Sequence, residues 1–304
     1  MRTMLQLCRL ALTLLLILAV PAWGSSIAVV ISEQGGMYTE FSGLLEEGLA
    51  GTNWTVSSTI PAENLARIPG QPDLIVTVGS DALRKTLGKA DSTPVLATLL
   101  PKQNYEKIMA EFRRHPGRVT AIYLDQPAAR QAAFVNFLLP GQKRAGMLFS
   151  SETKNTASQY RLAFGNAGIK LDGEDIDSDN MLLPALNALL GRVNYLVAIP
   201  DSTIYRRDNI KAILITAFRY QRPVIAYSPS FVNAGALAAL HTTPAQIARQ
   251  TADAIINHGT SLQAPTGPNQ FAIAINSNVA QSLNLNVPDE ATIRRAMLGD
   301  KEAR

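Results

Sequence analysis

Short β-rich runs alternate with amphipathic helical runs along most of the chain, and this alternation is the feature that most constrains its fold. Ile27–Ser32 (IAVVIS) and Leu74–Val78 (LIVTV) are short, almost continuously apolar and rich in β-branched residues, which is typical of strands buried on both faces. The helical run 38–49 between them places Phe41 and Leu45 on one face. Strands separated by helices need crossover connections, so the pattern predicts parallel sheets with helices on both faces.

The alternation continues through two successive sets of about five strands, one before and one after roughly Leu124. This predicts an α/β chain with two doubly wound parallel-sheet lobes. No low-complexity linker separates the two sets, so we expect a tight hinge with several chain crossings. Further strands are expected at Trp54–Ser58, Val95–Leu99, Val119–Leu124, Ala145–Ser150, Tyr195–Ile199, Pro223–Tyr227 and Phe271–Ile275.

The N-terminus has the order of residues of a cleavable secretion signal. Arg2 and Arg9 precede the apolar run Leu10–Val20, and a helix-breaking proline and small residues then lead to an expected cut after Gly24. The apolar run is too short to cross the ~30 Å hydrocarbon layer comfortably, although a retained membrane anchor is the alternative interpretation. The processed protein is therefore expected to be soluble in the periplasm.

Cysteine content and charge exclude several classes of protein. Cys8 is the only cysteine and precedes the expected cut, so the processed chain would have no disulfide, thiolate nucleophile, cysteine metal site or lipid anchor. The net charge of +4 falls to +2 when Arg2 and Arg9 leave with the signal. The remaining basic residues are dispersed, so nucleic-acid binding is not expected. Motifs for a nucleophilic serine, a phosphate loop or a histidine metal site are missing, and we predict neither catalysis nor a cofactor.

Polar residues follow the predicted strands at the sheet edge where parallel sheets bind ligands. Helices that begin there present free N–H groups, which suit an anionic group, and a buried aspartate suits an ammonium group. Together these features predict an amino acid or a similar small polar ligand. Any one of these residues taken singly is more readily interpreted as an ordinary helix cap, and the collection facing one cleft carries the prediction. The predicted ligand-binding residues are Ser80, Asp125, Ser151, Asn155, Asp201, Ser202, Tyr227 and Ser228.

Several segments resemble one family, the periplasmic ABC-transporter substrate-binding proteins of the tryptophan and aromatic amino-acid type. Residues 223–240 (PVIAYSPSFVNAGALAAL) resemble its P-V, polar-loop, G-A-L-A pattern near the hinge. Residues 138–144 (LLPGQKR) resemble its L-x-P-x-x-K-R entry to the second lobe, and 282–288 (SLNLNVP) its A-L-G-L-x-I-P ending. The resemblance implies a type I periplasmic binding protein fold that closes on a small-molecule ligand, with the membrane permease of an ABC importer as partner.

The sequence pattern and the resemblance together divide the chain. Residues 1–24 would be the signal peptide and 293–304 a C-terminal tail. One lobe would comprise 25–124 with 241–259, and the other 125–240 with 260–292. Gly79-Ser80-Asp81 replaces the T-P-A of the family, so tryptophan itself is not carried over as the ligand.

The leading hypothesis is a periplasmic solute-binding protein that captures a small polar ligand between two lobes for an ABC-type importer. One alternative is a periplasmic sensor or partner-binding subunit of the same fold that signals to a membrane receptor. The other is a hydrolase built on a doubly wound sheet, which the missing nucleophile motif disfavours.

Overall fold

The computed structural model describes residues 24–89, 92–113 and 118–299. The predicted signal peptide therefore lies outside the described residues except for Gly24, and so do the last five residues of the expected tail. Among the described residues, no helix combines the length and apolar character that a membrane span needs.

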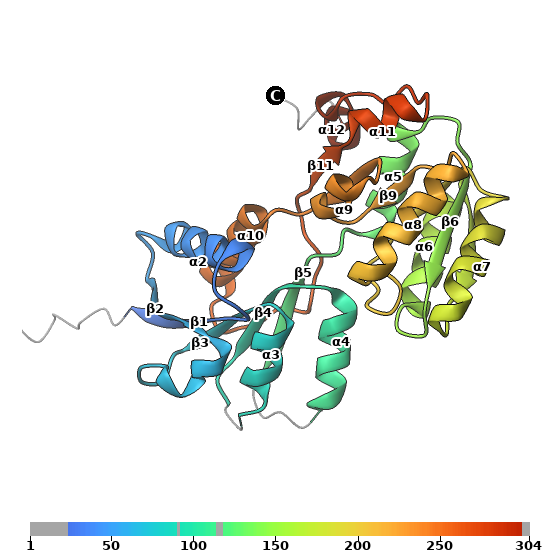
Figure 1. The fold of residues 1–304 in the computed structure, drawn as a ribbon. Coiled ribbons are helices and arrows are strands. Elements are labelled where there is room, and N and C mark those ends of the chain that lie inside the picture. The colour runs from blue at the N-terminus through green and yellow to red at the C-terminus, as the bar shows by residue number, and fades with distance from the viewer. Residues whose placement is uncertain (1–23, 90–91, 114–117, 300–304) are drawn as a thin grey trace, which may run out of the picture.

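The first lobe is built on a five-stranded parallel sheet in the order β2-β1-β3-β4-β5 (Figure 1). Its strands are β1 (Ser25–Ile31), β2 (Trp54–Pro61), β3 (Leu74–Val78), β4 (Val95–Leu100) and β5 (Val119–Tyr123). Its helices are α2 (Gly36–Leu49), α3 (Ser80–Leu87), α4 (Lys102–Glu111) and α10 (Pro244–His258), with the 3-10 helix η1 (Ala62–Arg67).

Alternation along the buried strands explains why both faces of this sheet are covered. Val29 packs with α2 and α10, whereas the next residue, Val30, points to the other face and packs with α3, α4 and η1. The helix α10 follows β10 (Ala238–His241) of the second lobe in sequence, yet it lies against α2 and completes the first-lobe core (Figure 1).

The second lobe contains a six-stranded sheet in the order β11-β10-β9-β8-β6-β7, in which only β11 runs antiparallel. Its strands are β6 (Arg144–Phe149), β7 (Lys170–Asp175), β8 (Tyr195–Val197), β9 (Val224–Ala226), β10 (Ala238–His241) and β11 (Ala272–Ile275). One face is covered by α5 (Ala128–Leu138), α6 (Lys154–Asn166), α11 (Ser277–Ser282) and α12 (Glu290–Leu298). The other is covered by α7 (Asp179–Leu190), α8 (Arg207–Arg219) and α9 (Pro229–Ala234).

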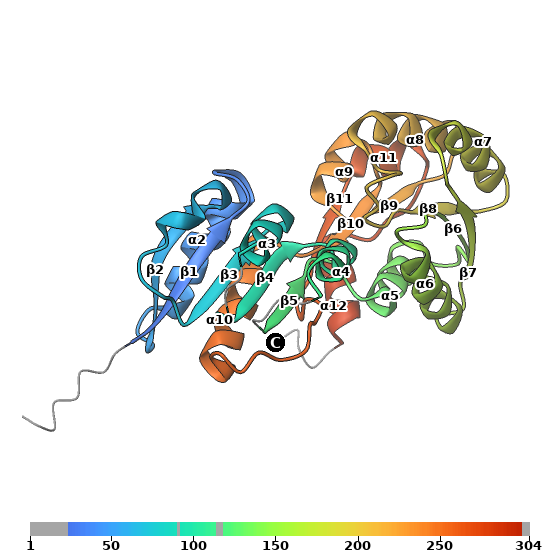
Figure 2. The ribbon, with the colours of Figure 1, turned by 90° about the horizontal axis from the view of Figure 1, so that it is seen from below.

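The predicted architecture of two parallel-sheet lobes is confirmed, and Figure 2 shows the two sheets side by side. The described chain passes between the lobes three times, near residues 124–127, 241–243 and 267–271. We call these segments the crossings.

The lobe boundary expected at residue 260 is wrong. Strand β5 lies at the edge of the first sheet, and its backbone groups there need hydrogen-bond partners. Residues 260–266, assigned to the second lobe from the sequence, run beside β5 in the first. Thr266 bridges Ile122 in parallel, the Tyr123 N–H donates to the Thr266 carbonyl at 2.9 Å, and the Thr120 hydroxyl donates to the Gln263 carbonyl at 2.6 Å. We call residues 260–266 the strap.

The prediction of a C-terminal tail from residue 293 is also wrong for residues 293–298, which belong to α12. Asp289 caps α12 by accepting a hydrogen bond from the Thr292 N–H at 2.7 Å, and this helix packs against α5. Ile293 is 1% exposed within the second-lobe core. Burial of this apolar face holds the segment in place, so the ordered lobe extends to at least Leu298.

Candidate functional site

A cavity of about 180 Å³ lies where the two lobes meet at the crossings. We call it the cleft cavity. Strand ends form much of its wall: Pro101 follows β4, Leu124 follows β5, and Tyr227 follows β9. The carboxyl ends of parallel strands are the expected place for a ligand in such sheets. The lining residues are Met37, Pro101, Leu124, Asp125, Gln126, Gln131, Tyr160, Pro200, Tyr227, Ser228, Pro229, Leu240, His241 and Thr242.

Asp125 is the only carboxylate among these lining residues. Its Oδ2 accepts a hydrogen bond of 2.6 Å from the backbone N–H of Lys102, the first residue of α4. Burial nevertheless dominates and raises the pKa of Asp125 to about 6. A ligand group that donates hydrogen bonds or carries positive charge would therefore favour the ionised form of the Asp125 carboxyl group.

Two tyrosine rings, those of Tyr160 and Tyr227, line the cavity from the second lobe, and Tyr205 and Phe231 contact Tyr227 without lining the cavity. The Tyr227 ring lies 5.3 Å from that of Phe231 and 6.2 Å from that of Tyr205, and the last two rings are 5.6 Å apart. Burial raises the pKa of Tyr227 to about 12, so its hydroxyl stays protonated. Tyr160 adds another ring from α6, and burial followed by the charge of Asp125 raises the pKa of its hydroxyl. These fixed rings suit the apolar or aromatic part of a ligand.

Asp201, predicted to contact ligand, has both carboxylate oxygens occupied by protein donors. Oδ2 accepts from the Ser150 N–H at 3.1 Å, the Ser150 hydroxyl at 2.7 Å and the Thr153 hydroxyl at 2.6 Å. Oδ1 accepts from the backbone N–H groups of Thr203 and Ile204 at 2.9 and 3.0 Å. The residue is 3% exposed and does not line the cleft cavity. Its contacts connect the turn after β6 to the loop after β8, which is a structural role.

Ser202 takes part in a contact between the lobes. Its hydroxyl donates to Glu152 Oε2 at 2.6 Å, and Glu152 Oε1 pairs with Lys107 Nζ at 3.1 Å. Lys107 belongs to α4 of the first lobe, whereas Glu152 lies between β6 and α6 of the second. Ser202 thus supports an ion pair across the lobes and is not among the residues that line the cleft cavity.

Three other predicted residues also lie outside the lining of the cleft cavity. Ser80 is the first residue of α3, where Gly79 occupies the N-cap position, and its hydroxyl accepts a hydrogen bond from Asn104 Nδ2 at 3.0 Å. Ser151 and Asn155 are exposed at the start of α6. The structure therefore brings together three of the predicted residues: Asp125, Tyr227 and Ser228.

The crossings are joined by two side chains that sequence reasoning did not single out. Gln126, in the first crossing, contacts both of the others: its Nε2 donates to the His241 carbonyl at 3.3 Å, the Thr242 hydroxyl at 2.6 Å and the Gln270 carbonyl at 2.9 Å. Arg130 donates to Gln126 Oε1 at 2.7 Å and to the backbone of the third crossing. No motif marks these residues, but Gln126 directly follows the predicted Asp125 at a strand end, which is a usable signal.

Metal binding finds no support in the part of the chain that the structure describes. There, no group of three or more histidine, cysteine, aspartate or glutamate side chains is placed to hold an ion. Burial lowers the pKa of His241, so this cavity-lining imidazole is neutral at pH 7.

Comparison with known proteins gives a family match over most of the chain. The family model described as ABC transporter substrate binding protein matches residues 46–296. No curated protein matches the chain in sequence.

Three solved structures share the fold at low sequence identity. A conserved domain protein from Vibrio cholerae is 19% identical, with a TM-score of 0.60 over 90% of this chain and 98% of that one. An ABC domain from Streptococcus solved in complex with L-Trp is 16% identical, with a TM-score of 0.62 over 90% and 98%. A ligand-free, open substrate-binding protein with adhesive properties from Clostridium difficile is 14% identical, with a TM-score of 0.67 over 87% and 96%. The chain belongs to the ABC transporter substrate-binding protein family and has the type I periplasmic binding protein fold.

Proposed function

We propose that this protein is a periplasmic solute-binding protein that captures a small amphipathic molecule, such as an amino acid or a related compound, for an ABC importer. The observation that carries the proposal is the cleft cavity at the crossings, which Asp125 and the rings of Tyr160 and Tyr227 line together. A ligand held there contacts both lobes, so its binding would favour the closed arrangement that a permease recognises. The role needs no chemical step.

The chemistry of the lining narrows the ligand class. Most lining side chains are apolar or aromatic, and no lysine or arginine is among them. This lining supports a ligand with an apolar body and a hydrogen-bond donor or ammonium group directed at Asp125. Because a structural neighbour was solved with L-Trp, aromatic amino acids and their amines are the first compounds to test.

We propose Asp125, Tyr160, Tyr227 and Ser228 as direct contacts. Ser80, Ser151 and Asn155 begin or lie near the starts of helices at the strand ends, and we propose that they reach the ligand only when the lobes close.

A thermal-shift screen of amino acids, aromatic amines, purines and vitamins tests the proposal. A compound at about 100 times its Kd adds about 2.7 kcal/mol of stability to the folded state. Tyr227→Ala should weaken the hit at least tenfold in calorimetry, whereas Tyr220→Ala, which removes an exposed tyrosine at the end of α8, should leave its affinity unchanged. If no compound raises the melting temperature, or if both variants bind equally well, the cleft cavity is not the ligand site. Uptake of the hit by cells with and without the protein then tests the importer role.

A further inference from the structure

Exposed large hydrophobic side chains gather on two neighbouring helices of the second lobe, α7 and α8. Nine such side chains are exposed in the described residues; these two helices carry four of them, and no other helix there carries more than one. The four are Met181, Leu183, Ile215 and Phe218, each between 43 and 45% exposed. The two helices share one core cluster and lie side by side (Figures 1 and 2). We call their exposed residues the outer face.

The helix α7 lacks the charged solvent side that a surface helix normally has. From residue 180 to its end at Leu190 it reads NMLLPALNALL, without one charged residue. Its other leucines are buried against the sheet, yet Met181, Leu183 and Pro184 are exposed. A helix that is apolar on most of its sides is normally covered on both. The composition of α7 is therefore that of a helix with a partner on its outer side.

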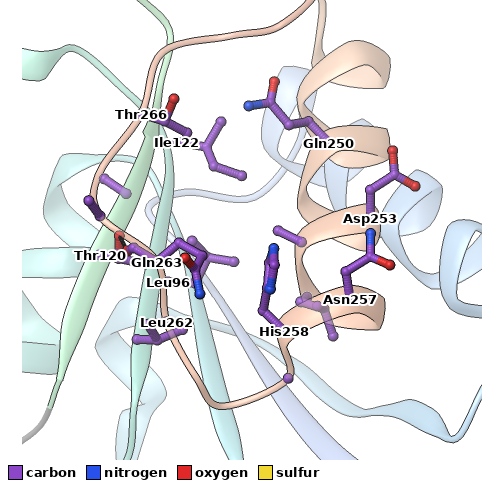
Figure 3. Close-up of a pocket in the computed structure, with 15 residues that line it drawn as sticks. Leu96, Thr120, Ile122, Gln250, Asp253, Asn257, His258, Leu262, Gln263 and Thr266 are labelled. Carbon is purple, nitrogen blue, oxygen red and sulfur yellow. Dashed lines mark hydrogen bonds between the residues drawn. The ribbon is translucent and has the colours of Figure 1, made fainter.

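The helix α10 of the first lobe shows the ordinary pattern by comparison. Figure 3 shows Gln250, Asp253 and Asn257 following one another along α10, beside the groove that the strap borders. Asp253 and Asn257 are exposed, so water solvates this side of the helix. The outer side of α7 has no such row of polar groups beyond its asparagines.

The helix α8 adds positive charge to the outer face. Arg207, Lys211, Ile215 and Arg219 follow one another at intervals of four residues, which places them along one side of the helix. Phe218 lies next to this row, and all five side chains are exposed. Asp208 is the only acidic residue of α8, so the row is cationic overall.

Helix stability does not explain where these cations lie. Arg207 is the first residue of α8, where the helix dipole disfavours positive charge, and Lys211 one turn later repels it. Neither of them, nor Arg219, forms an ion pair with the side chains that the structure describes. Three uncompensated cations beside exposed apolar groups are complementary to a surface that is both anionic and apolar beneath.

We infer that the outer face docks on an anionic phospholipid surface. Ile215, Phe218 and Met181 enter the boundary between headgroups and acyl chains, while the cations of α8 contact lipid phosphates. Long cationic side chains can cover apolar groups and keep their charged ends in water at such a surface, whereas the core of a protein interface is depleted in charged residues. A second copy fits less well, because a twofold axis through α8 would bring like charges together.

This inference goes beyond the proposed function and does not depend on the ligand. No residue of the outer face lines the cleft cavity, so docking leaves that cavity accessible. A protein held in this way would remain close to the membrane in which an importer lies.

Co-sedimentation with lipid vesicles tests the inference. Wild-type protein without its signal peptide is mixed with vesicles of phosphatidylglycerol and phosphatidylcholine in equal parts, or of phosphatidylcholine alone, at about 0.15 M salt. We expect binding to the anionic vesicles only, and weaker binding at higher salt. No binding to anionic vesicles, or equal binding to both kinds, overturns the inference.

Substitutions place the contact on the outer face. Each cation near an anionic surface changes the affinity about fivefold, so Lys211→Gln with Arg219→Gln should weaken binding about 25-fold. The control, Lys89→Gln with Arg249→Gln, removes two exposed charges from the first lobe and should change binding less than twofold. Equal losses in the two double variants show that only net charge matters and refute the assignment.

Phe218→Ser tests the apolar part of the contact and should weaken binding at least fivefold at every salt concentration, with circular dichroism reporting that the variant folds. Unchanged binding contradicts insertion of this face. A dimer in analytical ultracentrifugation that Phe218→Ser dissociates places a second copy on the outer face and overturns the lipid assignment.

Discussion

Replacing Asp201 by asparagine separates a structural role for this buried carboxylate from a ligand-binding role. Asparagine keeps one oxygen, which can still accept from the Thr203 and Ile204 N–H groups. Its NH₂ group replaces Oδ2 and faces three donors. The two hydroxyls can rotate to accept, but the Ser150 N–H cannot and keeps only its bond of 3.1 Å to the Thr153 hydroxyl.

The expected loss follows from these contacts. A buried N–H that loses an acceptor costs about 1–3 kcal/mol, and hydrogen bonds to a neutral oxygen are weaker than those to a carboxylate. The lower desolvation cost of the neutral amide offsets part of this loss. We therefore expect Asp201→Asn to lower the free energy of unfolding by about 2–3 kcal/mol.

Urea denaturation with linear extrapolation measures this change. Asp177→Asn, at an exposed position, is the control and should change stability by less than about 0.5 kcal/mol. Ligand affinity is measured on the same proteins under conditions where all are folded. An Asp201→Asn protein of normal stability that has lost ligand affinity tenfold would refute the structural assignment and restore Asp201 as a ligand contact.

Three further predictions concern the cleft, the contact between the lobes and one turn. Burial raises the pKa of Asp125 from 3.8 to about 6, so ionisation of this carboxyl group opposes folding, and its contribution to the free energy of unfolding falls by about 2 kcal/mol as pH rises from about 4 to about 6. In urea titrations, the difference in free energy of unfolding between wild type and Asp125→Asn should therefore change over this pH range. A constant difference contradicts the assignment. Lys107→Gln breaks the exposed ion pair with Glu152, so it should lower the free energy of unfolding by less than about 1 kcal/mol. The same substitution should increase the radius of gyration in X-ray scattering, because the pair joins the two lobes. An unchanged radius means that the pair does not hold the lobes together. Gly79→Ala should lower the free energy of unfolding by more than about 1 kcal/mol, because Gly79 has a φ of +94° and a Cβ there would lie 2.4 Å from a serine hydroxyl. The control, Gly43→Ala on the open side of α2, should instead stabilise the protein by about 0.5–1 kcal/mol. Equal effects of the two substitutions on the melting temperature would contradict this.

The sequence predicts the architecture because burial on both faces leaves a strong pattern. The third strand begins and ends where the apolar run does, at Leu74–Val78. Strand β10 (Ala238–His241) leaves no such pattern, since alanine has little preference for strands. It forms a strand because β9 and β11 pair with it on either side, and that information lies outside the segment.

The candidate site was less predictable because strand-end position does not determine where a side chain is used. Asp125 and Asp201 both follow strands, yet one lines the cleft cavity and the other is enclosed by protein donors. Tyr160 lies on an amphipathic helix and looks like a core residue in sequence. The strap was assigned to the wrong lobe because its pairing with the β5 edge depends on tertiary structure alone.

The position of α10 sets an order of events for the newly made chain. The sheet of the first lobe cannot bury its α10-facing side until a segment that follows nearly all of the second sheet has been made. Contacts between distant segments form slowly because a long loop must close first. The second lobe likewise needs β11 and α12, which follow α10 in the chain and complete its own core, so neither lobe can finish folding early. A protein ordered in this way stays incomplete until its C-terminal quarter arrives.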